Sequence, residues 1–553
     1  MVRRAAQPSS AAVSELLPRG TICFAHVPDF SRTREQWHGS DLYQLYREPT
    51  VQDFLGKPLS KLPKQDVASQ TLQEIDQLDP KDAFVAVTSI ENNNPRFAGG
   101  LRFRGNRSDA EKILNRWISP LTRDGSKHET VDYEHHNIDI VGSEPNQIAT
   151  VYDGQRFFAS NDLAELKAIL DRADHREKDR QSTLSGDNEF LSAAKHMPSG
   201  YAFQFYLQPK LLTQKLASLP TGVRWQIPED QNALLGEIGS ICGAMRFDNG
   251  KMHDTLFVAA PKPKDQTLTR SSLQLGTTDT FLYIAKLLNF ERLAALSQTG
   301  AGTTAGGWLQ KVFVVSERAG VTIDDWNAAF EGEAGTLADW PEHAHWPSLI
   351  ATIPVKDAER ANKVVTAVTA AIDEDAVWNK TEKDGARYFV MQTPASLISI
   401  TPTVAVSNRI VIAGLDTGAV EAAMNRAKSD GRNPASPLSN SAHYRSAAGL
   451  LPEPTNLFAY VDMPLLYSRL DAALRPILLM SAAFMPAISD HVDVTKLPPP
   501  ETVTKHLSPI VCWQRYDGDG YVAESVGPIT LNQAALGVGL AAGWWAFGHE
   551  KAP

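Results

Sequence analysis

The densest group of side chains that could bind a metal or transfer a proton lies in the first third of the chain. It contains His128, Glu129 and the adjacent pair His135 and His136. Histidine is a common metal ligand and a proton shuttle near neutral pH. Asp132 stands where a His-Glu-x-x-His motif needs its second histidine, and adjacent residues of a strand point to opposite faces. We therefore expect a solvated strand edge or loop here, with a metal site as the alternative.

The turn Asp517-Gly-Asp-Gly520 has the acidic spacing with which a calcium-binding loop begins. A complete loop also needs a bidentate Glu at its twelfth position, which is Pro528 in this chain. A similar turn, Asp248-Asn-Gly250, occurs late in the first half of the chain. We therefore expect a hairpin turn here and no calcium site.

Two other segments match binding motifs only in part. The alternate spacing of His343 and His345 could place two ligands on one strand face, but Pro341 and Pro347 indicate a loop. The glycine-rich segment 300–307 lacks a following Lys-Ser or Lys-Thr, the residues that would hold phosphate and magnesium. It is expected to be a flexible loop.

The remaining candidates are acidic pairs and a second glycine-rich run. Asp324 and Asp325, and the acidic residues at 373–375, are best explained by solvated helix starts. The run 537–543 has no preceding strand-helix-strand context, and the chain has no Gly-x-Ser-x-Gly elbow of an esterase. The sequence therefore predicts no cofactor site and no metal site, and it identifies no catalytic residue.

The composition is that of a globular protein with material for more than one core. The chain has 553 residues, of which 42% are hydrophobic and 21% charged. Its formal net charge of -10, without a cluster of Lys and Arg, argues against nucleic-acid binding. Cys23, Cys242 and Cys512 are too few and too scattered for a zinc site or a disulfide framework. We expect Cys242 and Cys512 to be buried in strands, with a bridge between the two halves as the alternative.

The elements that must position any site occur twice along the chain. A β-rich run and the helical pattern after it, 154–160 and 162–173, recur as 407–413 and 417–427. Smaller matches keep the same order, and they align Arg156 with Arg409 and Pro198 with Pro452. A nearly constant offset between matches is typical of tandem duplication, which fixes the architecture.

The repeat predicts a fold class and a set of boundaries. Asp153-Gly154 between two β-rich runs predicts a hairpin, and Asn106 to Asp109 predicts a helix cap before the pattern 110–118. We expect an α+β fold in which each half is a mainly antiparallel sheet covered by helices. The expected segments are a flexible lead-in over 1–18, a first repeat over 19–260, a linker over 261–279, a second repeat over 280–528 and a hydrophobic tail over 529–553.

The two ends of the chain carry different expectations. The segment 529–548 has twenty residues without a charge and ends in Trp544-Trp-Ala-Phe547, which suits a membrane span with an aromatic end. The alternative is an apolar helix docked on the second half. At the start, the basic residues Arg3 and Arg4 are not followed by an apolar signal-peptide core. We expect that the protein stays inside the cell or that a leader is missing.

The first repeat resembles a known group of sequences. Leu17-Pro-Arg-Gly-Thr21 leads into Phe24-Ala-His-Val-Pro-Asp29, and Trp37, Leu42-Tyr43 and Phe54-Leu55 follow. This pattern is similar to the start of an uncharacterised bacterial family, a domain of unknown function common in planctomycetes and verrucomicrobia. The resemblance covers most of residues 17–527 through patterns of low specificity. It implies the same strand-helix units and an association with the bacterial envelope, and it carries no catalytic residue over.

Taken together, the sequence favours a non-enzymatic, envelope-associated binding or scaffold protein. The 529–548 segment would provide membrane contact, and a cytoplasmic location would follow if that segment is a docked helix. The alternative is an enzyme of unrecognised type, such as a hydrolase, with its site between the two halves. Enzymes built by duplication often keep a complete polar constellation in one cleft, whereas the polar candidates here are scattered along the chain.

Overall fold

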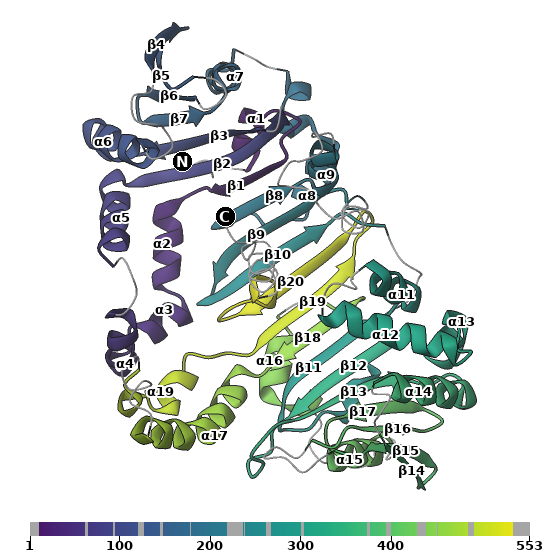
Figure 1. The fold of residues 1–553 in the computed structure, drawn as a ribbon. Coiled ribbons are helices and arrows are strands. Elements are labelled where there is room, and N and C mark those ends of the chain that lie inside the picture. The colour runs from purple at the N-terminus through teal and green to yellow at the C-terminus, as the bar shows by residue number, and fades with distance from the viewer. Residues whose placement is uncertain are drawn as a thin grey trace, which may run out of the picture. The chain divides into compact units, whose positions relative to one another are not determined.

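In a computed structural model the chain divides into two compact units. Unit 1 comprises residues 1–261 together with 517–522, and unit 2 comprises residues 262–516 together with 523–553. Both units contain helices and antiparallel strands, which confirms the predicted α+β class (Figure 1). The structure describes residues 10–60, 65–91, 94–119, 127–143, 147–176, 179–217, 236, 238–261, 267–299, 304–372, 377–393, 400–428, 438–450, 452–484 and 492–534.

The strands of unit 1 form one antiparallel order, β4-β5-β6-β7-β3-β2-β1-β8-β9-β10. The Asp153-Gly154 hairpin joins β6 to β7, as predicted. The strands are β1 (Cys23–Val27), β2 (Pro80–Glu91), β3 (Asn94–Phe103), β4 (His128–Tyr133), β5 (His136–Val141), β6 (Ile148–Asp153), β7 (Arg156–Ser160), β8 (Phe203–Leu207), β9 (Ile241–Asp248) and β10 (Lys251–Val258).

The strands of unit 2 follow the corresponding order, β14-β15-β16-β17-β13-β12-β11-β18-β19. Every pairing is antiparallel, and β19 pairs with β20. The strands are β11 (Thr280–Leu287), β12 (Glu333–Asp339), β13 (Ser348–Pro354), β14 (Trp378–Lys383), β15 (Ala386–Met391), β16 (Thr403–Val406), β17 (Ile410–Gly414), β18 (Leu457–Val461), β19 (Ile510–Tyr516) and β20 (Tyr521–Gly527), of which the first two residues belong to unit 1.

Helices connect and cover these strands in both units. Those of unit 1 are α1 (Ser10–Leu16), α2 (Phe30–His38), α3 (Asp41–Tyr46), α4 (Pro49–Ser60), α5 (Gln65–Leu78), α6 (Arg107–Ile118), α7 (Leu163–Ala173), α8 (Asn188–Ala194) and α9 (Pro209–Ala217). Those of unit 2 are the 3-10 helix η4 (Ser271–Leu275), α11 (Phe290–Thr299), α12 (Thr304–Arg318), α13 (Ile323–Ala329), α14 (Ala358–Ile372), α15 (Thr417–Lys428), α16 (Ala442–Ala448), α17 (Met463–Phe484) and α19 (Pro500–Thr504).

Local sequence signals start the two helices that flank β7. The Asn106 side chain caps α6 by accepting the Ser108 amide at 2.8 Å, as the sequence predicts. Asp162 caps α7 by accepting the Ala164 amide at 2.8 Å. α7 then buries the apolar stripe Leu166, Ile169 and Leu170 in the core of unit 1, because residues three and four apart share a helix face.

Three predicted loops or linkers are more ordered than the sequence indicates. The lead-in predicted over 1–18 contains helix α1, and Val13 and Leu17 are buried in the core of unit 1. In the predicted linker 261–279, Leu268 and Leu275 are buried in the core of unit 2. The loop predicted at 300–307 is wrong for its second half, because residues 304–307 begin α12. In the first two cases a few buried apolar side chains stabilise the structure of a stretch rich in small or polar residues.

The cysteines are free thiols, so the alternative of a bridge between the halves is not realised. Cys242 and Cys512 are buried in strands, as predicted. Burial raises the pKa of the Cys242 thiol to about 12, which keeps it protonated and unreactive at neutral pH.

The beginning of the hydrophobic tail packs against unit 2. Thr530 is fully buried, and the amide group of Asn532 donates to the Ala523 carbonyl at 3.3 Å. The rest of the predicted membrane segment, 535–548, lies outside the described residues. Among the helices that the structure does describe, none has both the length and the apolar character needed to cross a bilayer.

Candidate functional site

The inward face of the unit 1 sheet changes from apolar to polar along its strands. One cross-strand row is Tyr206, Phe24, Ala86, Ala98 and Ser160, and all five residues are buried. Because successive side chains alternate between the two faces of a sheet, the residues two and four positions further on belong to the same face.

Those next two rows contain the polar groups. His26 lies in register with Phe84, which lies in register with Gly100. Beyond them comes a row formed by Asp82, Arg102 and Arg156. The inward face of the sheet therefore ends in one histidine, one carboxylate and two guanidinium groups.

These residues line a cavity of about 190 Å³, which we call the His26 pocket. It lies at the ends of β1, β2, β3 and β7, and residues of α1 and α7 line it as well. The lining residues are Val13, Glu15, Leu16, His26, Asp82, Phe84, Gly100, Leu101, Arg102, Arg156, Phe158, Arg172, Ala173 and His175. Phe84, Phe158 and His26 are buried, whereas Arg156 and His175 are exposed, so the pocket has an apolar interior and a basic rim.

His26 is the most deeply buried ionisable group of the pocket, with 4% of its surface exposed. Its Nδ1 lies 2.9 Å from the Tyr201 hydroxyl. Burial, with a smaller contribution from the positive charge of Arg102, lowers the pKa of His26 to about 4. The imidazole is therefore neutral at pH 7 and can act as one donor and one acceptor.

The other charges of the pocket are held by ion pairs and backbone contacts. Asp82 is buried and forms an ion pair with Arg102, its cross-strand neighbour. Arg172 of α7 donates to the Leu16 carbonyl of α1 at 2.8 Å and lies 3.3 Å from the Glu165 carboxylate. These contacts hold α1 and α7 against the open end of the sheet.

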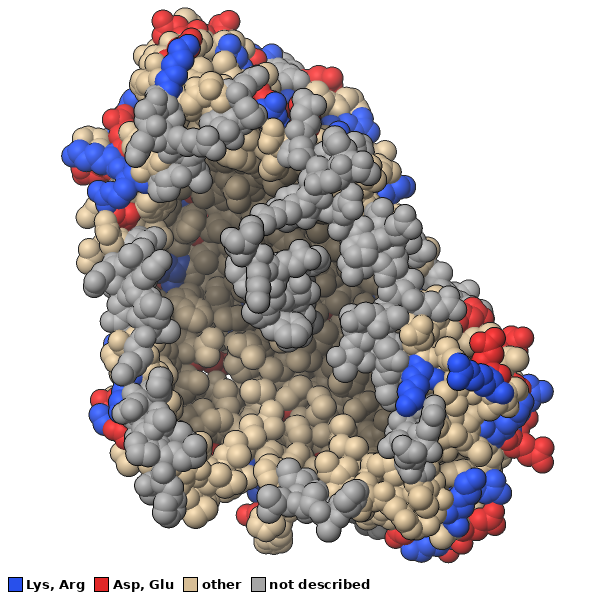
Figure 2. All heavy atoms as spheres, in the orientation of Figure 1, with Lys and Arg blue, Asp and Glu red and all other residues tan. Residues whose placement is uncertain are grey.

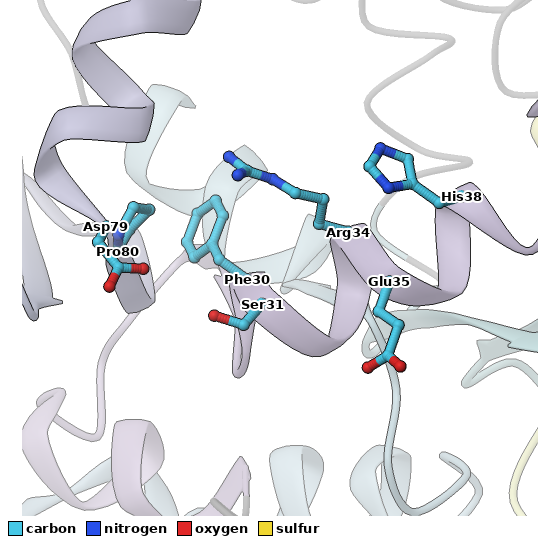
Figure 3. A pocket seen from close by; sticks show the side chains of 7 residues that line it. All are labelled: Phe30, Ser31, Arg34, Glu35, His38, Asp79 and Pro80. Atoms are coloured by element: carbon cyan, nitrogen blue, oxygen red, sulfur yellow. The ribbon is translucent and has the colours of Figure 1, made fainter.

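A second hollow, of about 290 Å³, lies along α2 (Figure 3). Phe30, Arg34 and His38 project from one side of the helix, while Glu35 points away from them. Arg34 pairs with Asp76, and more than half of each side chain is exposed. Because these charges stay in contact with water, the hollow does not create the desolvated polar environment found in the His26 pocket.

The His128–His136 cluster is a surface hairpin, as expected from the sequence. His135 occupies the turn between β4 and β5 with a φ of 77° and is exposed. His136 is partly buried, and its Nε2 lies 2.9 Å from the Asp174 carboxylate. The Tyr133 hydroxyl donates to Asp171 at 2.8 Å. These contacts attach the hairpin to the end of α7. His136 takes part in this attachment, whereas His135 forms the exposed turn.

The Asp517–Gly520 segment is a hairpin turn between β19 and β20, as predicted, and it belongs to unit 1. Asp519 accepts hydrogen bonds from Lys195 at 2.8 Å, from His196 at 3.2 Å and from Ser192. Burial alone would raise the pKa of Asp519, but these three donors lower it to about 2. The Asp519 carboxylate therefore anchors the turn by accepting hydrogen bonds from α8 and the residues that follow it.

Other sequence candidates have structural roles where the structure describes them. His343 and His345 lie in the loop between β12 and β13, as predicted. Asp325 forms a capping box with Thr322 at the start of α13, which confirms the helix-start interpretation. The segments 373–375 and 537–543 lie outside the described residues. Within the described ranges, no three His, Cys, Asp or Glu side chains are grouped so that they could hold a metal ion.

The charged surface of unit 1 is mixed in sign. Over β4–β7 and α6, Lys and Arg side chains are interspersed with Asp and Glu (Figure 2). On this face no broad basic patch is visible among the side chains that the structure describes.

The sequence motifs did not identify the His26 pocket, although a signal was present. His26 shares its strand face with Phe24, and Asp82 shares its face with Phe84 and Ala86. An ionisable residue on the apolar face of a strand with alternating polarity is unusual, because burial of an unpaired charge is costly. A search of the sequence for ionisable residues at apolar-face positions of strands would have identified both His26 and Asp82.

Comparisons with known proteins do not identify a family. No family model matches the chain, and no curated protein matches it. Solved structures of TP0453 in crystal forms III, I and IV are similar at 10%, 9% and 10% identity, with TM-scores of 0.24, 0.23 and 0.23. The matches cover 46%, 48% and 45% of this chain and 81%, 83% and 83% of those chains. TM-scores this low establish no common fold.

Proposed function

We propose that the protein is a non-enzymatic binding protein and that the His26 pocket of unit 1 is its ligand site. One observation carries this proposal. Unit 2 has the same strand order, but register places Ala285, Pro354 and Ile410 where unit 1 has His26, Arg102 and Arg156. The fold therefore forms without these polar side chains. Because burying polar groups costs free energy, their presence in unit 1 favours a role in binding.

The chemistry of the pocket favours binding over the alternative, an enzyme such as a hydrolase. Among the lining residues that the structure describes there is no Ser, Thr, Cys or Lys, so these residues offer no hydroxyl, thiol or amine nucleophile. His26 is buried beside Tyr201, and Asp82, a carboxylate of the lining on the neighbouring strand, is neutralised by Arg102. These groups can orient a ligand through hydrogen bonds, which is the common role of a few polar groups in an apolar pocket.

The shared strand order also supports a tandem duplication of one ancestral α+β unit, with repeats over 19–260 and 280–528. The helices that follow equivalent strands agree with this origin, since α7 follows β7 and α15 follows β17. The resemblance to the uncharacterised bacterial family and its envelope association belong to the same proposal. An experimental structure in which the two units do not superpose strand for strand would contradict the duplication.

Envelope association is supported by one surface of unit 2. Consecutive residues of α17, from Pro476 to Met480, are exposed and apolar. A helical turn has about 3.6 residues, so this run is apolar on all sides of the helix. A single flat protein partner would leave part of that circumference in water, whereas the apolar part of a lipid surface can surround it.

Vesicle binding tests the envelope part of the proposal. The full chain should sediment with phosphatidylcholine vesicles, and Leu479→Ser with Met480→Ser should reduce the bound fraction severalfold. Leu191→Ser is the matched control, because Leu191 is an exposed leucine of unit 1. A chain ending at Ala534 separates the contribution of 535–548 while keeping the buried Thr530. Equal sedimentation of the variant and the control would contradict a role for α17.

A pocket-filling substitution tests the ligand site. A Cβ atom at Gly100 would lie 2.4 Å from Phe84 Cε1, so Gly100→Val must push Phe84 into the pocket. A Cβ atom at Gly99 would meet only the Phe84 carbonyl at 3.4 Å, which makes Gly99→Val the matched control. The proposal predicts that a small aromatic probe binds the wild type and Gly99→Val, and that Gly100→Val loses it. Equal binding by the two variants would overturn the proposal.

A further inference from the structure

The charges that line the His26 pocket do not balance. Arg102 is paired with Asp82, and Arg172 is paired with Glu165. Glu15, on the α1 side, lies 3.6 Å from Arg180. These contacts account for each lining carboxylate and for two of the three lining arginines. What remains is a positive charge on the rim.

That charge belongs to Arg156. In the described part of the chain its side chain forms neither a hydrogen bond nor an ion pair, and it is exposed at the start of β7. Asp153 is its register neighbour on β6, but no ion pair joins the two. A guanidinium without a partner retains its full capacity for a two-pronged hydrogen bond to a carboxylate or phosphate.

The position of Arg156 also favours an anion. Arg102 and Arg156 are direct cross-strand neighbours on β3 and β7. Like charges in this arrangement repel each other, because side chains opposite each other on antiparallel strands start about 5 Å apart. Asp82, which lies on the side of Arg102 away from Arg156, neutralises the charge of Arg102. An anion between the pocket mouth and Arg156 would offset the other.

The interior of the pocket requires that this anion has an apolar body. Beneath the basic rim, the lining includes Phe84 and Phe158 of the sheet and Val13 and Leu16 of the α1 region. An inorganic anion would leave these apolar surfaces in contact with water. An organic anion would place its hydrocarbon or aromatic body against the two phenyl rings and keep its charged end at the rim.

From this geometry we infer that the His26 pocket binds a small organic monoanion, a carboxylate with an apolar body, whose charged end is held by Arg156. The neutral imidazole of His26 offers a hydrogen bond within the pocket and adds no second positive charge. A dianion is disfavoured, because only one lining guanidinium lacks a carboxylate partner. The inference rests on the proposed function, since it assigns a ligand class to the same pocket.

Calorimetric titration with three probes tests the ligand class. The probes are 4-bromobenzoate, its neutral isostere 4-bromobenzamide and inorganic phosphate. We expect 4-bromobenzoate to bind at least about tenfold more tightly than the amide, because a hydrogen bond to a charged group is stronger than a neutral one. Phosphate should bind more weakly than 4-bromobenzoate, since it has no apolar body to bury.

Substitution of the rim arginine tests the residue assignment. Arg156→Gln should lower the affinity for 4-bromobenzoate at least about tenfold and leave the affinity for the amide unchanged. Arg409→Gln is the matched control, because Arg409 is an exposed arginine of the corresponding hairpin in unit 2. Since Arg156 is exposed, the variant is expected to fold, and its circular dichroism should match that of the wild type.

The outcomes separate the two proposals. If the benzoate and the amide bind equally and Gly100→Val abolishes both, the pocket is a ligand site but the anionic class is wrong. If phosphate binds most tightly and Arg156→Gln abolishes its binding, the apolar body is wrong. If no probe binding responds to Gly100→Val or Arg156→Gln, both the proposed function and the ligand class fail.

Discussion

The two units share a strand order but treat the same end of the sheet differently. In unit 1 the polar row of Asp82, Arg102 and Arg156 borders an open pocket. In unit 2 the position equivalent to Asp82 is occupied by Glu333, which is buried. Its two carboxylate oxygens accept hydrogen bonds from the amides of Thr269, Arg270 and Ser271 at 2.7, 3.1 and 2.7 Å and from two hydroxyl groups.

Unit 2 thus fills the equivalent space with its own chain. Gly335 occupies the position in unit 2 that is equivalent to Phe84 in unit 1. Ser272 of η4 packs so closely against this glycine that a Cβ atom on Gly335 would lie 2.2 Å from the Ser272 hydroxyl oxygen. Leu275 of the same short helix is fully buried. In unit 2, residues 269–272 therefore occupy the end of the sheet that borders the cavity in unit 1.

The largest expected effect comes from removing the carboxylate that closes unit 2. Glu333→Ala should lower the free energy of unfolding by about 4 kcal/mol, because several buried donors lose their acceptor. Asp82→Ala should cost only about 1 kcal/mol, because the partly exposed Arg102 can be hydrated instead. Urea denaturation followed by circular dichroism measures both. Equal losses would contradict the different roles of the two acids.

The next effect concerns pH and comes from His26, whose equivalent position in unit 2 is Ala285. Unfolded histidine has a pKa near 6.5, and His26 in the fold has a pKa of about 4, so the unfolded state binds more protons between these values. The contribution of His26 is fully present above pH 6.5 and is lost as the pH falls toward 4, up to about 3 kcal/mol. His26→Gln should remove this part of the pH dependence. A wild type and variant with parallel stability curves from pH 7 to pH 4.5 would refute the buried, neutral histidine.

A smaller effect is expected from closing the pocket of unit 1. Gly100→Val should destabilise the protein by about 2 kcal/mol, because Phe84 must leave its position over the glycine. Gly99→Val, on the opposite strand face, should cost less than about 0.5 kcal/mol. Thermal unfolding of both variants measures the difference. If the two variants are equally stable, Phe84 does not rest on Gly100 as described.

The smallest effect comes from a turn that the units share. His135 has a φ of 77° between β4 and β5, and its counterpart between β14 and β15 is Gly385 with a φ of 74°. His135→Gly, which copies unit 2, should stabilise the protein by about 0.5 kcal/mol, because glycine adopts positive φ without strain. His136→Ala should cost about 1 kcal/mol through its contact with Asp174. Chemical denaturation of both variants resolves the two signs.

The sequence predicted elements that are fixed by short-range signals. The Asp153-Gly154 hairpin and the cap at Asn106 depend on residues within a few positions of each other. The assignment of residues 517–522 to unit 1 was not predictable in this way, because Asp519 meets Lys195 only after the chain has folded.

The sequence repeat did not reveal the pocket, because a shift of one residue in the strand pairing determines which side chains line it. The repeat aligns Arg156 with Arg409, but in the sheet Arg156 faces Arg102, and the equivalent position opposite Pro354 is Ile410. The hairpin of β16 and β17 has a longer turn than that of β6 and β7, which absorbs the difference. A shift by one residue moves a side chain to the other face of a strand, so a sequence match cannot show which arginine lines a cavity.

The central claim is that unit 1 contains a site for an organic anion in a place that unit 2 fills with its own chain. A crystal structure of the full chain with 4-bromobenzoate tests it directly, because the anomalous signal of bromine locates the ligand. We expect one bromine peak beside Phe84 and Phe158, with the carboxylate at Arg156 and no peak at the equivalent place beside Gly335. Bromine only at other surfaces, or a peak in the pocket with the carboxylate directed away from Arg156, would contradict it.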